Sequence, residues 1–299
     1  MSTLVLLAIT GLGLGALYFL VASGLSLIYG LMRVLNFAHG AFLTVGGYLG
    51  YEVGRHLGSS SGVTSWPVFA LMVLVGAAAS AVFAALAELL LIRRLYQREI
   101  EQVLVTVGLG LAAIALVNGI WGADARPLPQ PGWMQRTTGV LGADVPNQRF
   151  VCIIAAVLVL VGLLLVLHRT RYGLIIRAGV ENRAMVSALG IDVRRSFTTV
   201  FVLGGALAGI GGVLTALYNG TVSPGMGDSL LIFAFIVVVI GGLGSIVGSA
   251  AASVGVALLQ QFANYYAASG VGDLTVVLAL ALVLLWRPEG LLGRTVRAA

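Results

Sequence analysis

Residues 3–30, TLVLLAITGLGLGALYFLVASGLSLIYG, decide the fold of this chain. The stretch carries no charged side chain, and a helix needs about 20 apolar residues to cross a bilayer. A cleavable leader starts with basic residues and has a shorter apolar run, whereas this chain opens with Met1, Ser2 and Thr3. We therefore interpret the stretch as a first membrane span.

The composition extends this interpretation to the whole chain. Of its 299 residues, 59% are hydrophobic and only 9% are charged, and the mean hydropathy is +1.05. Soluble domains are about 25% charged. We expect an all-α polytopic membrane protein, a single transmembrane domain over 1–299, with about eight to ten helices. The candidate crossings lie near 3–30, 37–53, 66–92, 102–121, 150–168, 198–218, 229–242, 245–266 and 272–287. The second, seventh and eighth are short or glycine-rich, so each is a candidate for a broken or re-entrant segment.

The charge pattern orients the chain. The net charge is +6, and every cation is arginine because the sequence contains no lysine. A basic balance in a soluble protein indicates nucleic acid, but in a membrane protein it marks cytoplasmic loops. We therefore expect no nucleic-acid partner, an external N-terminus, a cytoplasmic C-terminus, a cytoplasmic loop over 169–197 and an extracytoplasmic loop over 122–149. The clustered arginines are Arg93, Arg94 and Arg98; Arg169, Arg171, Arg177, Arg183, Arg194 and Arg195; and Arg287, Arg294 and Arg297.

Several kinds of chemistry are excluded by what the sequence lacks. Without lysine the chain cannot form a P-loop, so any ATP must be hydrolysed by another chain. The single cysteine, Cys152, excludes an internal disulfide and a cysteine-based metal cluster. We expect no catalytic residue, no metal and no cofactor on this chain. Glu88 is the most embedded acidic residue, and we expect it to snorkel or to pair with an arginine. An ion-coupled carrier is therefore a weak hypothesis.

The basic loop contains a short amphipathic helix, predicted over 177–189. Arg177 and Glu181 are four residues apart and can pair, while Met185 and Leu189 share an apolar face. Gly190 follows as a stop signal. Such a helix can dock into a groove on a soluble partner, or it can rest on lipid headgroups. The pattern alone leaves both interpretations open.

Two further segments carry candidate features. Residues 122–149 are polar and rich in proline, which suits either a plain connector or a contact with an external partner. The run Gly241-Gly242-Leu243-Gly244-Ser245 is too dense in glycine for helix packing alone. It predicts a turn or a helix break, where exposed backbone can contact a solute.

Three long stretches carry a family resemblance. The first is GLGLGALYFLVASGLSLIYGLMRVLNFAHGAFLTVGGYLGY at 11–51, with Asn36-Phe37-Ala38-His39-Gly40 as a signature. The second is RAGVENRAMVSALGIDVRRSF at 177–197, and the third is IVVVIGGLGSIVGSA at 236–250, followed by LLWRPEGLLGR at 284–294. The chain resembles the permeases of the high-affinity branched-chain amino acid ABC importers, specifically the first of their two permease types.

The resemblance implies a permease subunit of an ABC importer in the bacterial inner membrane, with no catalytic activity of its own. It implies a second related permease, which is either a copy of this chain or a different one. It also implies two cytoplasmic ATPase subunits that hold ATP and Mg, and a periplasmic substrate-binding protein. The segment around 177–191 then becomes a coupling helix seated in a cleft of an ATPase. Its coupling residues are Arg177, Glu181, Asn182, Arg183, Met185, Leu189, Gly190 and Ile191.

For the translocation path we name residues that place polar groups, an aromatic ring or exposed backbone in an otherwise apolar region. They are Asn36, Phe37, His39, Gly40, Gly241, Gly242, Gly244 and Ser245. The alternative for His39 is a hydrogen bond to a neighbouring carbonyl. The solute could instead be urea, a short amide, an aromatic acid or a sugar. A stand-alone secondary carrier or channel, and a structural scaffold, are the hypotheses from other classes.

Overall fold

The chain is a bundle of helices in a computed structural model, which describes residues 2–33, 35–58, 62–96, 98–181, 185 and 193–293. Nine long helices correspond to the nine expected crossings, so the expectation of an all-α polytopic membrane protein is confirmed within the described residues. They are α1 (Ser2–Met32), α2 (His39–Leu57), α3 (Trp66–Leu90), α4 (Glu99–Trp121), α5 (Gln148–Arg169), α8 (Val193–Asn219), α9 (Met226–Gly241), α10 (Ile246–Tyr266) and α11 (Val271–Trp286). A short helix, α6 (Arg171–Glu181), follows α5, and a 3-10 turn, η1 (Ile92–Arg94), follows α3.

Six of these helices are long and apolar enough to cross a bilayer, namely α1, α3 with η1, α4, α5, α8 and α10. The helices α9 and α11 are apolar but have only 16 residues each. The expectation of a short seventh segment is thus met by α9, whereas the eighth segment is a full helix of 21 residues. The last helix ends at Trp286, because the residue before a proline, here Arg287 before Pro288, avoids the helical conformation.

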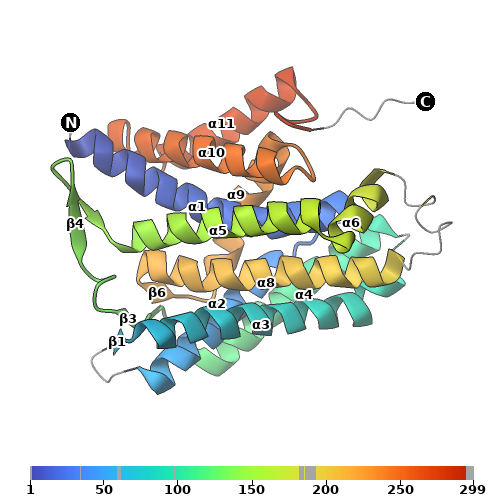
Figure 1. The fold of residues 1–299 in the computed structure, drawn as a ribbon, viewed down its shortest axis with the longest axis horizontal. Helices are drawn as coiled ribbons and strands as arrows, with labels where there is room; N and C mark the ends of the chain where they lie inside the picture. The colour runs from blue at the N-terminus through green and yellow to red at the C-terminus, as the bar shows by residue number, and fades with distance from the viewer. Residues whose placement is uncertain are drawn as a thin grey trace.

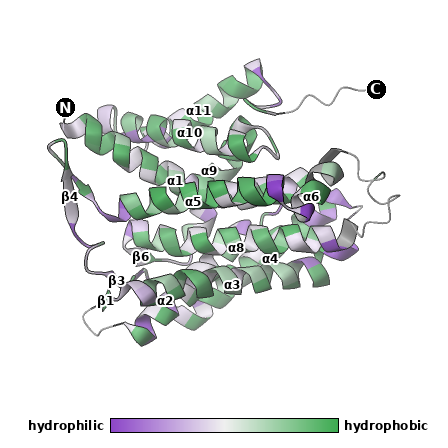
Figure 2. Cartoon of the chain, in the orientation of Figure 1, coloured by the Kyte–Doolittle hydropathy of each residue, from purple (hydrophilic) through white to green (hydrophobic). Residues whose placement is uncertain are grey.

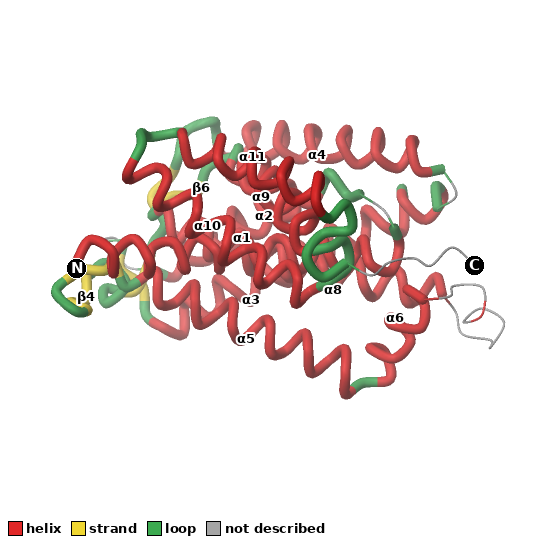
Figure 3. The backbone as a smooth tube through the Cα atoms, turned by 90° about the horizontal axis from the view of Figure 1, so that it is seen from above, coloured by secondary structure: helices red, strands yellow, loops and turns green. Residues whose placement is uncertain are grey.

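The bundle has a buried centre and two exposed flanks. In the apolar 18-residue stretch that identifies each helix as a span, 78% of the residues are buried in α8 and 56% in α1. The corresponding shares are 22% in α4 and 17% in α5. Figure 3 shows α4 and α5 on opposite sides of the bundle, with α1 and α2 between them. Hydrophobic residues run along the helices, and hydrophilic ones gather at the two ends of the bundle (Figure 2). This pattern is the one expected of a multi-pass membrane protein.

The helices α2, α3 and α8 form the tightest part of the core because their backbones touch at glycines. A Cβ atom on Gly209 of α8 would lie 2.3 Å from the carbonyl oxygen of Gly76 in α3. A Cβ on Gly212 would lie 2.1 Å from the carbonyl oxygen of Leu43 in α2. Small residues let membrane helices approach in this way. Ser80 of α3 adds a hydrogen bond from its hydroxyl to the Phe42 carbonyl, 2.6 Å long.

Short strands cover one end of the bundle, which we call the strand end (left in Figure 1). The expected loop at 122–149 is folded there into β2 (Arg126–Pro127), β3 (Gln130–Pro131), β4 (Thr137–Val140) and β5 (Ala143–Pro146). The strands β4 and β5 form a hairpin, β2 pairs with β6 (Thr221–Val222), and β3 pairs with β1 (Val63–Thr64). The start of α1 lies at this end too, while α6 lies at the opposite end, which we call the α6 end (Figure 1).

We predict that Gly209→Ala destabilises the protein, because the added methyl group would lie 2.3 Å from the Gly76 carbonyl. Overpacking of this kind costs about 1–3 kcal/mol. The measurement is thermal unfolding of the purified protein in mild detergent. The matched control is Gly162→Ala in α5, where an added Cβ would meet nothing within 4 Å. Equal melting temperatures for the two variants would contradict the close approach of α3 and α8.

Candidate functional site

The signature string at 36–40 lies between the end of α1 and the start of α2. Asn36 is fully buried, and its side-chain oxygen accepts a 3.1 Å hydrogen bond from the backbone N–H of Ala38. The Asn36 carbonyl accepts a second bond from the N–H of His39, at 3.3 Å. These contacts turn the chain into α2. The Asn36 amide nitrogen has no hydrogen-bond partner within the described part of the chain.

His39 ties the start of α2 to the middle of α1. Its ring is fully buried, and Nε2 lies 3.1 Å from the carbonyl oxygen of Val21. The ring meets the Phe42 ring edge-on at 6.1 Å between centroids. The contact with a neighbouring carbonyl is therefore present, as the alternative interpretation expects. The ring is fully buried, and a role for His39 in the path remains a prediction.

Phe37 and Gly40 connect the same string to α4 and α9. The Phe37 backbone N–H donates to the Thr106 hydroxyl at 3.3 Å, and its ring lies 5.0 Å from the Phe235 ring of α9. Gly40 faces Gly227 so closely that a Cβ added to Gly40 would lie 2.8 Å from the Gly227 carbonyl oxygen. Residues of the string thus contact α1, α4 and α9 at the start of α2. Its position beside α9 is compatible with the predicted path, which stays a prediction.

The run Gly241–Ser245 is a turn, as expected, because α9 ends at Gly241 and α10 begins at Ile246. Gly242 and Gly244 have φ of +101° and +82°. Residues that carry a Cβ atom rarely adopt this backbone conformation. Gly244 also packs against the end of α1, where a Cβ added to Gly30 would lie 3.2 Å from the Gly244 Cα. Ser245 caps α10 by accepting a 3.1 Å bond from the Gly248 N–H.

The C-terminal segment closes this turn. The N–H groups of Leu291 and Leu292 donate to the carbonyls of Ile240 and Gly241, at 2.7 and 3.1 Å. They satisfy two carbonyls that the end of α9 leaves without a helical partner. The two stretches of sequence at 236–250 and 284–294 therefore meet in space. Gly241 and Gly242 are buried, whereas Leu243 and Gly244 are exposed.

The predicted coupling residues lie at and beyond the end of α6. Arg177 and Glu181 belong to this helix, and Met185 is 61% exposed. The other five candidates, Asn182, Arg183, Leu189, Gly190 and Ile191, lie outside the described residues.

The prediction that the helix begins at residue 177 is wrong, because α6 begins at Arg171. The reason is an N-cap, since the Thr170 hydroxyl accepts a 3.1 Å bond from the Gly173 N–H. The signal was Thr170 itself, an N-cap residue type that His168 and Arg169 separate from the apolar run ending at Leu167.

Glu88 forms a polar cluster at the α6 end. The sequence predicts instead that its side chain reaches the surface or pairs with an arginine. Its carboxylate is fully buried and accepts hydrogen bonds from the Tyr96 hydroxyl and, at 2.8 Å, from the Thr198 hydroxyl. It neither reaches the surface nor forms an ion pair with an arginine among the described residues. Two hydroxyl donors replace the expected arginine and satisfy the buried oxygens. Glu88 thereby joins the end of α3 to the start of α8.

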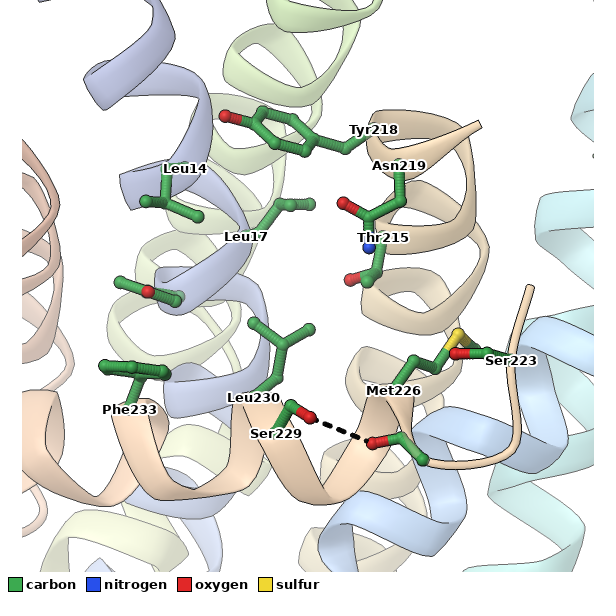
Figure 4. Close-up of a pocket in the computed structure, with 12 residues that line it drawn as sticks. Leu14, Leu17, Thr215, Tyr218, Asn219, Ser223, Met226, Ser229, Leu230 and Phe233 are labelled. Atoms are coloured by element: carbon green, nitrogen blue, oxygen red, sulfur yellow. Dashed lines mark hydrogen bonds between the residues drawn. The ribbon is translucent and has the colours of Figure 1, made fainter. Parts of the chain in front are cut away.

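A cavity of about 390 Å³ opens at the strand end between α1, α8 and α9, and sequence analysis did not predict it. Its lining comes from three distant parts of the chain, as Figure 4 shows. The lining residues are Leu14, Leu17, Tyr18, Thr215, Tyr218, Asn219, Ser223, Gly225, Met226, Ser229, Leu230 and Phe233. No motif links these residues, so only the packing of the three helices reveals them.

We predict that Glu88→Ala destabilises the protein more than Glu88→Gln. Alanine would remove the charged acceptor of the half-buried Tyr96 and Thr198 hydroxyls, and a hydrogen bond to a charged group contributes about 1.5–3 kcal/mol. Glutamine retains the shape and one carbonyl acceptor, and its amide can donate to a hydroxyl. Unfolding in detergent measures both variants, with Glu101→Gln on the exposed face of α4 as the control. A Glu88→Ala variant as stable as the control would show that the cluster does not hold α3 and α8 together.

Comparison with known proteins agrees with this architecture. The sequence profile of the family described as "Branched-chain amino acid transport system / permease component" matches residues 7–286. No solved structure matches the chain.

Three curated relatives illustrate the range of the similarity. The high-affinity branched-chain amino acid transport system permease protein BraD of Pseudomonas aeruginosa is 29% identical, over 96% of this chain and 94% of BraD. The corresponding protein LivH of Salmonella typhimurium is 27% identical, over 95% of this chain and 94% of LivH. The permease protein LivM of Escherichia coli is 29% identical, over 93% of this chain and 68% of LivM. Since the family profile covers almost the whole chain, this protein belongs to the branched-chain amino acid transport system permease family.

Proposed function

We propose that this chain is a non-catalytic permease subunit of an ATP-driven importer for branched-chain amino acids. The observation that carries the proposal is the family match over residues 7–286, together with relatives of that name that align over 94% of their own length. The architecture agrees with it, because a bundle of apolar helices that encloses a cavity suits a solute path.

The chain works with partners in this proposal. Its similarity to both LivH and LivM supports pairing with a second, related permease of the other type. With no lysine in the sequence, the chain cannot supply the phosphate-binding lysine of a P-loop. Two ATPase subunits therefore hold ATP and Mg on the cytoplasmic side, and a periplasmic binding protein delivers the solute.

The orientation follows from the arginines. The α6 end carries the clusters that include Arg93, Arg94, Arg169 and Arg171, whereas charges at the strand end are of mixed sign. Positive side chains mark the cytoplasmic side. The α6 end then faces the cytoplasm of a bacterial inner membrane, with the N-terminus and the segment 122–149 outside and the C-terminus inside.

Coupling runs through α6 and the residues that follow it. This segment joins α5 directly to α8, so an ATPase that moves it pulls on both helices. The start of α8 is bound to α3 through Thr198 and Glu88, and α8 packs along α3 and α2. A displacement at the α6 end is thus passed to the helices that enclose the path. The chain supplies a passage that alternates between outward and inward openings, with no covalent step.

The test is reconstitution of the chain in proteoliposomes with its second permease, the ATPases and the binding protein. We expect uptake of radiolabelled L-leucine that requires ATP and the binding protein. Uptake that continues without ATP or without the ATPases would overturn the proposal in favour of a carrier or channel. ATP-dependent uptake of another solute, with none of leucine, isoleucine or valine, would overturn the choice of solute.

We predict that Arg177→Ala combined with Glu181→Ala abolishes leucine uptake while the complex still hydrolyses ATP. The two side chains orient the coupling segment in a partner groove through charge. The control is His168→Ala combined with Arg171→Ala, which removes charge at the α5–α6 corner without touching the coupling residues. Uptake and ATP hydrolysis are measured on the same proteoliposomes. Wild-type uptake by the Arg177/Glu181 variant would refute the assignment of these two residues.

A further inference from the structure

The cavity at the strand end has an apolar side and a polar side. Its apolar side consists of Leu14 and Leu17 from α1 with Leu230 and Phe233 from α9. The polar side comes from the end of α8 and the start of α9, where hydroxyl and amide groups line it. They belong to Thr215, Asn219, Ser223 and Ser229. Figure 4 shows the side chains of Thr215 and Asn219 pointing into the space between α1 and α8.

Thr215 is a buried polar group that lacks a partner. Its side chain is 2% exposed, and its hydroxyl oxygen has no hydrogen-bond partner among the described residues. A buried hydroxyl without a partner is costly, so most are satisfied by protein or by water. Since this hydroxyl lines the cavity, the group that satisfies it can come from whatever fills the cavity.

The start of α9 opens onto the same space. No side chain caps this helix start, where Gly225 is the N-cap residue. The first turn of a helix has a partial positive charge that favours a carboxylate; here the N–H of Met226 donates to the Ser223 carbonyl at 3.2 Å, and Asp228 lies in the same turn but outside the cavity lining. Gly225, Met226 and Ser229 from this turn line the cavity. The helix start and the unpartnered Thr215 hydroxyl are independent features that border one volume.

A positive charge lies beside the cavity. The guanidinium carbon of Arg149 is 3.2 Å from the centre of the Tyr218 ring, and Tyr218 lines the cavity. Arg149 donates to the Tyr218 carbonyl at 3.0 Å, but it has no acidic partner among the described ion pairs. The cation–π contact stabilises the charge, and its field adds to the preference for a carboxylate at this end.

We infer that this cavity binds the transported solute, an α-amino acid with an aliphatic side chain. The aliphatic side chain lies against Leu14, Leu17, Leu230 and Phe233, while the carboxylate lies toward Thr215 and the start of α9. The volume of about 390 Å³ suits a small ligand. The inference rests on the proposed function and adds a specific site to it.

The twelve lining residues carry no formal charge, which fits a site that must release its solute. A transport site has to bind well enough to be occupied and weakly enough to let go. Neutral hydroxyl and amide groups, with one charge held beside the cavity by Tyr218, meet that condition better than a direct ion pair. High affinity then belongs to the partner that delivers the solute.

The first test uses the complete importer in proteoliposomes and compares uptake of L-leucine with that of L-valine. Leu230→Phe narrows the cavity, so we expect leucine uptake to fall about tenfold more than valine uptake, because one methylene in an apolar pocket changes discrimination by about 10–200-fold. The control is Ile232→Phe, which adds a ring on the exposed face of α9, where Ile232 is 62% exposed. A purely structural defect would lower both rates alike and would overturn the inference.

The second test probes the hydroxyl. Thr215→Val removes it at constant shape and should lower uptake at least about tenfold, since a hydrogen bond to a charged group is lost, whereas Thr215→Ser should restore it. Equal rates for both variants would overturn the site.

For a readout that does not depend on these variants, Leu14→Cys is labelled with a methanethiosulfonate during turnover. Leucine should slow the labelling of Leu14→Cys and leave that of Leu12→Cys unchanged. No protection would overturn the site. Absence of any branched-chain uptake by the wild-type complex would instead refute the proposed function, and the inference with it.

Discussion

The contact of helix backbones at glycines is the constraint on which the rest of this structure depends. Lipid tails are as apolar as leucine side chains, so helices in a bilayer associate through close packing rather than through a hydrophobic force between them. The pairs Gly76–Gly209 and Gly40–Gly227 bring α3 onto α8 and α2 onto α9. A larger side chain at Gly40 or Gly227 would push α9 away from α2 and disturb the cavity at the start of α9.

This packing joins α3 and α8 from the α6 end into the middle of the bundle. The carboxylate of Glu88 holds the hydroxyls of Tyr96 and Thr198, so α3 and α8 are joined by polar contacts at one end and by glycines farther along. A buried carboxylate is costly unless its oxygens are satisfied. The arrangement therefore resists separation of α3 and α8 and favours their movement as a pair.

Sequence patterns predicted the features that depend on local composition. The apolar runs located the nine long helices, and the glycine run at 241–245 located a turn. The start of α6 was missed because the charge and apolar spacing predicted a helix that begins at Arg177. The N-cap Thr170 instead sets the start of the helix. The strands β2 and β3 were missed because they pair with residues far away, at 221–222 and 63–64.

Features that depend on tertiary packing left no sequence signal. Glu88 follows an ordinary apolar run, and nothing near it in the chain shows that Thr198 is its partner. The cavity draws on residues 14–18, 215–219 and 223–233, which meet only when α1, α8 and α9 assemble. Its polar residues are common types with no characteristic spacing. For a chain with no catalytic motif, such a site becomes visible only in three dimensions.

In the proposed path, the length of α9 sets how far the solute has to be moved through protein. Its 16 residues span about 24 Å at 1.5 Å per residue, which is shorter than the roughly 30 Å hydrocarbon core of a bilayer. The cavity reaches along its first two turns, and the glycine turn lies at its other end. From Phe233, the last residue of α9 to line the cavity, to Gly241 the helix rises about 12 Å, and the Phe37 ring packs against Phe235 within this stretch. In the proposed path, the solute therefore passes along a helix shorter than the bilayer core, and the contact between the Phe37 and Phe235 rings lies between the cavity and the turn.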